Sequence, residues 1–259
     1  MQPLTILEGI GLGALQGVTE FLPISSSGHL VLARALFGIR EAPVTVEVAL
    51  HAASLVAICI FFWREILSVF TTRRGLIPAL IVGTLPAAVL GVLLKDRIEA
   101  LFDNPLWVAI GMLLTGTVLW VGERRATDAK PLDAVTPSDG FWIGVAQAIA
   151  LVPGISRSGM TVSAGLASGL ERGAAVAFAF LLGVIAIGGA TVLKARAIAS
   201  FAEAGVAPLA LGCAASLVVS LAALGLLTFI VRRKCLRVFT IYCYLVGLAI
   251  VLAKLTGVW

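Results

Sequence analysis

Two polar segments interrupt long apolar sequence, and they constrain the fold of this chain more than any other feature. The first runs from Gln16 to His29 and reads QGVTEFLPISSSGH, and the second runs from Gln147 to Thr161 and ends in PGISRSGMT. A carboxylate, an imidazole, a guanidinium and several hydroxyls are costly in apolar surroundings unless they face one another or a water-filled cavity. We therefore predict that the two segments form one polar site.

The remaining sequence indicates an all-α, polytopic integral membrane protein. Of its 259 residues, 60% are hydrophobic and 13% are charged, and the mean hydropathy is +1.07. Apolar runs of about 20 residues, the length that a helix needs to cross the hydrocarbon core, recur along the chain. The four cysteines show no metal-ligand spacing, so we predict neither a metal cluster nor disulfides. Six regular spans are predicted, at about residues 44–63, 77–94, 105–121, 174–193, 207–231 and 237–257.

The two polar segments are predicted to lie in re-entrant helical hairpins. Residues 4–20 and 30–38 are short for a membrane span, and Pro23 with the serines that follow it separates them. Residues 139–172 likewise form two short apolar pieces, which divide at Pro153. Irregular backbone at membrane depth is tolerated only where protein or a water cavity covers it. A pair of hairpins that cover each other explains both breaks.

The two hairpins repeat one pattern at an offset of 131 residues. Eight of the 25 positions in residues 14–38 are identical to their counterparts 131 residues later. We predict one membrane domain over residues 1–259 with internal repeats at about 1–121 and 139–257. Each repeat would hold one hairpin and three spans, and an odd number of spans gives the second repeat an inverted topology. The identical pairs include Gln16 and Gln147, Ser25 and Ser156, and Gly28 and Gly159.

The positive charges of the loops favour one orientation in the membrane. With both termini outside, the inner side holds eleven Lys and Arg residues and the outer side holds seven. Because cytoplasmic loops carry the excess of positive charge, we predict that loops 64–75, 122–138 and 232–237 are cytoplasmic. The net charge is +5, but the basic residues lie in the loops between apolar spans. They therefore form no basic surface that could bind nucleic acid.

Both breaks carry groups suited to binding phosphate. Ser25–Gly28 comes just before a helical run, whose free N–H groups and hydroxyls favour an anion. An ordinary serine N-cap is the alternative interpretation. Arg157 lies at the matching break and needs an anionic partner, which is either a ligand phosphate or the carboxylate of Glu20.

Glu20 and His29 would add acid–base chemistry. Glu20 shares a helical face with Gln16, and a buried carboxylate can act as a general base or hold a cation. His29 directly follows the first break, where it could donate a proton to a leaving group, unless it is a neutral histidine bonded within the bundle. His51 lies four residues after Glu47, and we interpret this pair first as a structural hydrogen bond and second as part of the site. Together these groups indicate phosphoryl transfer.

The motifs resemble those of a known family. Gln16–His29 is similar to the (E/Q)xxxE motif and SSxGH segment of the undecaprenyl-pyrophosphate phosphatase family, also called bacitracin-resistance proteins. Pro153–Thr161 fits the PGxSRSxxT motif of that family. The resemblance implies an enzyme of the bacterial inner membrane that converts undecaprenyl pyrophosphate to undecaprenyl phosphate and inorganic phosphate, recycling the lipid carrier for peptidoglycan. It also implies a site that opens to the periplasmic side and a divalent cation, Mg²⁺ or Ca²⁺.

The resemblance also implies residue roles. Glu20 would be the essential acid and a candidate cation ligand, Ser26 the nucleophile, His29 the proton donor and Arg157 the pyrophosphate clamp. Gln16 occupies a place where many members have a second glutamate, so a two-carboxylate metal site would lose one ligand. Attack by Ser26 and direct attack by water both stay open. The residues expected to line the phosphates are Gln16, Ser25, Ser27, Ser156, Ser158 and Thr161.

Two other functions were weighed against hydrolysis by this family. A transporter or flippase for a polyprenyl phosphate would also use an inverted repeat and anion-binding half-helices. Transport needs no nucleophile and no proton donor, so Ser26 and His29 favour hydrolysis. Type 2 phosphatidic-acid phosphatases need a second histidine six residues after their arginine, and this chain has Ser163 there. The lipid chain length and the oligomeric state stay open, with a homodimer as one option.

Overall fold

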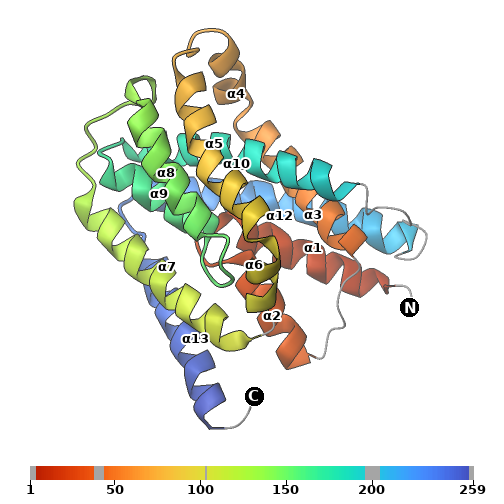
Figure 1. Cartoon of the computed structure of the whole chain (residues 1–259). Coiled ribbons are helices and arrows are strands. Elements are labelled where there is room, and N and C mark those ends of the chain that lie inside the picture. Colours follow the sequence, from red (N-terminus) through yellow and green to blue (C-terminus); the bar gives the residue numbers. More distant parts are fainter. Residues whose placement is uncertain (1–3, 38–43, 103, 196–204, 257–259) are drawn as a thin grey trace.

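The fold is entirely helical in the part of the chain that the computed structural model describes, which is residues 4–37, 44–102, 104–195 and 205–256 (Figure 1). The predicted all-α, polytopic membrane architecture is confirmed. The helices are α1 (Ile6–Phe21), α2 (Ser26–Phe37), α3 (Val44–Phe61), α4 (Trp63–Phe70), α5 (Leu76–Leu93), α6 (Lys95–Leu101), α7 (Pro105–Arg125), the short 3₁₀ helix η1 (Leu132–Ala134), α8 (Pro137–Ile149), α9 (Arg157–Ala167), α10 (Arg172–Ala195), α12 (Val206–Arg232) and α13 (Arg237–Leu255).

Five of the described helices, α5, α7, α10, α12 and α13, are long and apolar enough to cross a membrane. Helices α3 and α4 form a sixth candidate, which bends by 74°. The span predicted at about 44–63 corresponds to α3, and the helix that follows the break at Phe62 occupies part of the predicted loop 64–75. Trp63 and Arg64 follow directly, and both residue types prefer the membrane interface to its core, which accounts for a turn at this point.

Both predicted hairpins are present, and their first helices begin in the same way. The side chain of Thr5 accepts the backbone N–H of Glu8, whose carboxylate bonds back to Thr5, and this capping box starts α1. Thr136 and Asp139 form the same box at the start of α8, 131 residues later. The predicted repeat thus extends to the helix caps, while the limits of the two repeats stay a prediction.

The two breaks also share their construction. The hydroxyl of Ser25 accepts the N–H of Gly28, and that of Ser156 accepts the N–H of Gly159, each at 3.2 Å. These serines therefore cap α2 and α9. The chain reverses through a left-handed residue in each case, Ser25 with φ of 71° and Gly154 with φ of 84°. This conformation is rare for a residue other than glycine, so the first break is the more strained of the two.

Glycines bring the first helix of each hairpin against a long helix. Helix α1 packs on α12, and α8 packs on α5. A Cβ added at Gly13 would lie 2.0 Å from the carbonyl oxygen of Gly212, and a Cβ added at Gly144 would lie 2.2 Å from that of Gly83. Small residues allow such backbone contact between membrane helices. Gly13 and Gly144 are also 131 positions apart, so the two halves use equivalent contacts.

Ion pairs join the loops that were predicted to share one side of the membrane. Buried Arg172, at the start of α10, pairs with Glu123 at 3.2 Å and with Asp128 at 3.3 Å. These contacts hold the start of α10 against the end of α7 and the chain that follows it. The compartment that these loops face stays a prediction. The other pairs at this end are Arg73 with Asp133, Lys130 with Asp139, and Lys234 with Asp128.

The close contact of α1 with α12 can be tested by adding one methyl group. We predict that Gly13→Ala destabilises the protein, because the methyl would overlap the carbonyl oxygen of Gly212. Overpacking of this kind costs about 1–3 kcal/mol. Gly11→Ala is the matched control, since it lies on the same helix and a Cβ there meets nothing within 4 Å. Thermal unfolding in detergent measures the difference, and equal unfolding midpoints for the two variants would contradict this packing.

Candidate active site

The two helix breaks lie against each other and bring a carboxylate to a guanidinium. Glu20 is in the last turn of α1, and Arg157 is the first residue of α9. Nη2 of Arg157 donates to Oε1 of Glu20. The hydroxyl of Ser158 donates to the carbonyl oxygen of Leu22 at 3.3 Å, which adds a second bond between the hairpins.

Glu20 is the centre of the polar cluster. Its side chain is only 5% exposed. Its Oε2 atom accepts the hydroxyl of Ser26 at 2.9 Å and the amide Nε2 of Gln16 at 3.1 Å, and Nε2 of His51 lies 3.7 Å away. A buried carboxylate needs such partners, because an unpaired charge in apolar surroundings is costly. A hydroxyl that donates to a buried carboxylate is the arrangement expected of a nucleophile and its base.

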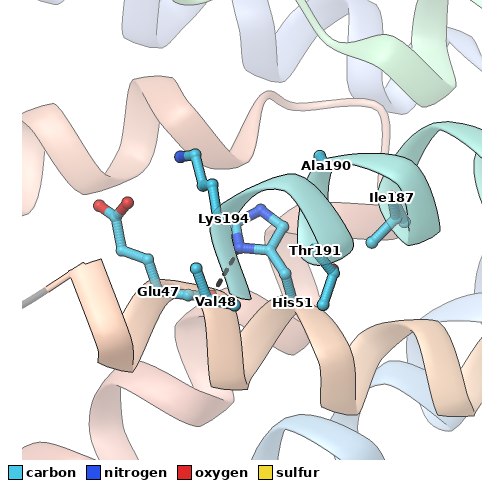
Figure 2. Close-up of a pocket in the computed structure, with 7 residues that line it drawn as sticks. All are labelled: Glu47, Val48, His51, Ile187, Ala190, Thr191 and Lys194. Atoms are coloured by element: carbon cyan, nitrogen blue, oxygen red, sulfur yellow. Dashed lines mark hydrogen bonds between the residues drawn. The ribbon is translucent and has the colours of Figure 1, made fainter. Parts of the chain in front are cut away.

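His51 connects Glu20 to a pocket between α3 and α10. Its Nδ1 atom lies 2.8 Å from the backbone carbonyl oxygen of Glu47 (Figure 2), so the hydrogen bond predicted between these two residues goes to the backbone and not to the carboxylate. Its Nε2 atom lies 3.7 Å from Oε2 of Glu20. A carbonyl only accepts, and Nδ1 therefore carries the proton. His51 thus contacts the polar cluster and also lines a small, partly open pocket. The other residues that line this pocket are Glu47, Val48, Ile187, Ala190, Thr191 and Lys194.

His29 lies beside the first break but bonds away from the ion pair. Its Nδ1 atom is 2.7 Å from the carbonyl oxygen of Ser25, and its Nε2 atom is 2.6 Å from the hydroxyl of Tyr242 on α13. The hydrogen bonds found among the described residues do not join His29 to Glu20 or Arg157. The structure therefore places His29 at the edge of the cluster, with a partner that the sequence did not suggest.

The other hydroxyls expected to line a phosphate are largely used inside the protein. Ser25 and Ser156 cap helices, as the alternative interpretation held. Thr161 donates to the carbonyl oxygen of Arg157 at 2.9 Å. Ser27 and Ser158 pair with the capping serine of their own hairpin, at 3.3 and 3.1 Å respectively. Ser26 and Ser27 are half-buried, whereas Ser25, Ser156, Ser158 and Thr161 are buried.

Thr115 on α7 braces the second break, and sequence reasoning missed it. Its Oγ1 atom accepts the N–H of Ser156 at 3.0 Å and lies 3.3 Å from the carbonyl oxygen of Gly154. Gly111, one turn earlier, lets the break approach: a Cβ there would lie 2.4 Å from the carbonyl oxygen of Pro153. The spacing of Gly111 and Thr115 is a small-xxx-small pattern, the one sequence signal that points to this contact.

The cluster is asymmetric although the hairpins repeat. The counterpart of Glu20 in the second hairpin is Leu151, and the counterpart of Arg157 in the first is Ser26. Gln147, the counterpart of Gln16, is 2% exposed, and its amide has no hydrogen-bond partner among the described residues. Each repeat therefore supplies one of the two charges.

The residues at the site fit a divalent cation only if the substrate supplies most of its ligands. The described residues contain no group of three or more His, Cys, Asp or Glu side chains that could hold a metal. Mg²⁺ commonly binds one or two carboxylates together with substrate phosphates and water. Glu20 offers such a carboxylate beside the place where a phosphate would meet Arg157.

Comparison with known proteins assigns the family. The sequence matches the family described as bacitracin resistance protein BacA over residues 9–249, a range that includes both breaks. The chain belongs to this family. The BacA-family chain is 38% identical over 255 residues to the undecaprenyl-diphosphatase of Carboxydothermus hydrogenoformans, which covers 96% of this chain and 98% of the relative. It is 39% identical over 256 residues to the undecaprenyl-diphosphatase of Moorella thermoacetica, with 96% and 97% covered.

Thr115 provides a test of how the second break is held. We predict that Thr115→Val, which keeps the shape of the side chain, destabilises the protein because the buried N–H of Ser156 loses its acceptor. An unsatisfied buried donor costs about 1–3 kcal/mol. Thr117→Val, two positions along and exposed, is the control. The thermal unfolding midpoint in detergent measures the effect, and a Thr115→Val midpoint equal to that of Thr117→Val would refute the brace.

Proposed function

We propose that this BacA-family protein hydrolyses undecaprenyl pyrophosphate to undecaprenyl phosphate and inorganic phosphate. The observation that carries the proposal is the contact of Glu20 with both Ser26 and Arg157 where the two hairpins meet. An acid, a hydroxyl and a guanidinium in one cluster are the groups that phosphoryl transfer needs. The relatives named undecaprenyl-diphosphatase, which align over nearly the whole chain, support the same substrate.

Arg157 would bind the terminal phosphate of the substrate. A guanidinium has five N–H donors in a planar fork that matches phosphate oxygens, and Glu20 takes a bond from only one end of this fork. The Arg157 side chain is 26% exposed, so its remaining donors can be reached. In the reaction they would stabilise the negative charge on the equatorial oxygens of the transferred phosphoryl group.

Glu20 would take the proton of Ser26. The Ser26 hydroxyl already donates to Oε2 of Glu20. As its oxygen attacks the terminal phosphorus, the O–H bond breaks, the proton moves to Glu20 and the bond from phosphorus to the lipid monophosphate breaks. Water would then release inorganic phosphate from the serine. Glu20 could equally activate a water that attacks directly, so the reaction class does not depend on which oxygen attacks.

His29 would donate a proton to the departing lipid monophosphate. Its Nδ1 atom is committed to the carbonyl oxygen of Ser25, so the proton would come from Nε2, which bonds to the Tyr242 hydroxyl in the structure. A divalent cation, Mg²⁺ or Ca²⁺, held by Glu20 and the pyrophosphate oxygens would neutralise part of the phosphate charge.

We propose the bacterial cytoplasmic membrane as the location, with the site opening to the periplasmic side and the product returning to peptidoglycan synthesis. The excess of Lys and Arg in loops 64–75, 122–138 and 232–237 supports this orientation. A homodimer and additional lipid transport stay predictions. The equivalent packing of the two hairpins would suit a transporter as well, but it gives no reason for a carboxylate bonded to a half-buried serine.

Conservative variants of the ion pair test the proposal. We predict that Glu20→Gln and Arg157→Lys each lower phosphate release roughly 100-fold or more, because each removes charge or geometry that stabilises the transition state. The measurement is inorganic phosphate released from undecaprenyl pyrophosphate by purified protein in detergent with Mg²⁺. Arg125→Lys, which changes an exposed arginine outside the cluster, should retain the wild-type rate. Wild-type rates in both site variants would remove the assignment.

A further inference from the structure

The hydrogen bonds of His29 fix its tautomer. Nδ1 lies 2.7 Å from the carbonyl oxygen of Ser25. A carbonyl oxygen can only accept, so Nδ1 carries a proton and Nε2 is the one ring nitrogen left to accept or donate elsewhere. Any proton that His29 gives to a substrate must therefore leave from Nε2.

Tyr242 occupies this nitrogen. Its hydroxyl lies 2.6 Å from Nε2, a short hydrogen bond between residues 213 positions apart. In neutral His29 the Nε2 atom is an acceptor, so the phenol donates. The two rings are also nearly parallel, with centroids 5.7 Å apart and planes at 11°. His29 is thus held at both nitrogens, and α13 supplies the contact at Nε2.

We propose that Tyr242 is a positioning residue for the reaction, acting through His29. This inference rests on the proposed function, since it assigns Tyr242 a task at the same site. A phenol hydroxyl can donate and accept, so it can bond to Nε2 in either protonation state of the ring. Tyr242 therefore keeps Nε2 in one direction while His29 gains and loses its proton.

The proton transfer at His29 balances within this arrangement. In the protonated ring, Nε2–H donates to the phenol oxygen of Tyr242 until the substrate is bound. The N–H bond then breaks as the oxygen of the departing lipid monophosphate takes the proton, and the ring becomes neutral. The Tyr242 hydroxyl then rotates to donate to the free lone pair of Nε2, and the 2.6 Å separation of the two atoms suits either direction of the bond. Water supplies the next proton to Nε2.

The two tyrosines of the chain provide a matched experiment. Tyr242→Phe keeps the aromatic ring and removes only the hydroxyl. Tyr244→Phe removes a hydroxyl from the same helix that bonds to Thr117 at 2.9 Å. We expect Tyr242→Phe to lower kcat about tenfold with little change in KM, because the lost contact acts on proton transfer and not on substrate binding. Tyr244→Phe should match the wild type.

A double-variant cycle separates positioning from a general structural role. In a His29→Gln background, Tyr242→Phe should cause no further loss, because its effect passes through the imidazole. An equal loss with and without His29, or no loss in Tyr242→Phe alone, overturns the proposal. Failure of the proposed function would look different, since the wild-type protein itself would release no phosphate from undecaprenyl pyrophosphate.

Nitrogen NMR provides a readout that does not need activity. The chain has two histidines, so ¹⁵N-histidine labelling gives the signals of two imidazole rings. We expect Tyr242→Phe to shift the Nε2 signal of one ring, which His29→Gln identifies by deleting it, and Tyr244→Phe to shift neither. Unchanged spectra in Tyr242→Phe protein would overturn the proposed contact even if the variant were inactive.

Discussion

The ion pair between Glu20 and Arg157 is the contact on which the rest of the structure depends. Neither charge can be buried alone in apolar surroundings, because removing one partner leaves an uncompensated charge that costs several kcal/mol. Each charge lies at a helix break, where backbone groups also need partners. Pairing the two breaks satisfies both demands, and it places the polar cluster where the two hairpins meet.

The repeated architecture builds the frame, and the departures from the repeat build the chemistry. Capping boxes, serine caps and close glycine contacts recur at the same offset in both halves. At the positions that matter for reaction the halves differ: an acid in the first corresponds to Leu151, and the arginine of the second corresponds to Ser26. A symmetric site would hold two like charges that repel. The differences between the halves at a few positions instead place an acid, a hydroxyl and a guanidinium in contact.

The hairpins and the groups at their tips could be predicted from the sequence. Polar residues inside an apolar run are costly, and such residues can be recognised from their sequence neighbours alone. Contacts between distant helices could not be predicted. The partner of His29 lies on α13, and no local pattern specifies that pairing. The small-xxx-small spacing of Gly111 and Thr115 signals a close contact of α7, but it does not say that the second break is the partner. Helix α4 was also missed, because Arg64 marked the end of the apolar run and the residues after it were assigned to a loop. The hydrogen bond of His51 to Glu47 was predicted, but the approach of its Nε2 atom to Glu20 was not.

Cross-linking the two hairpins tests the central claim most directly. A Cβ at position 159 would lie 3.2 Å from that of Pro23, close to the separation of about 3.5–4.5 Å in a disulfide. The measurement uses Pro23→Cys with Gly159→Cys in a chain without its native cysteines, cut by a protease at a site inserted between α7 and α8. Meeting hairpins predict that the two fragments stay joined on a denaturing gel until a reductant is added, whereas Pro23→Cys alone releases them. Fragments that separate without reductant under oxidising conditions would contradict a site shared by both hairpins.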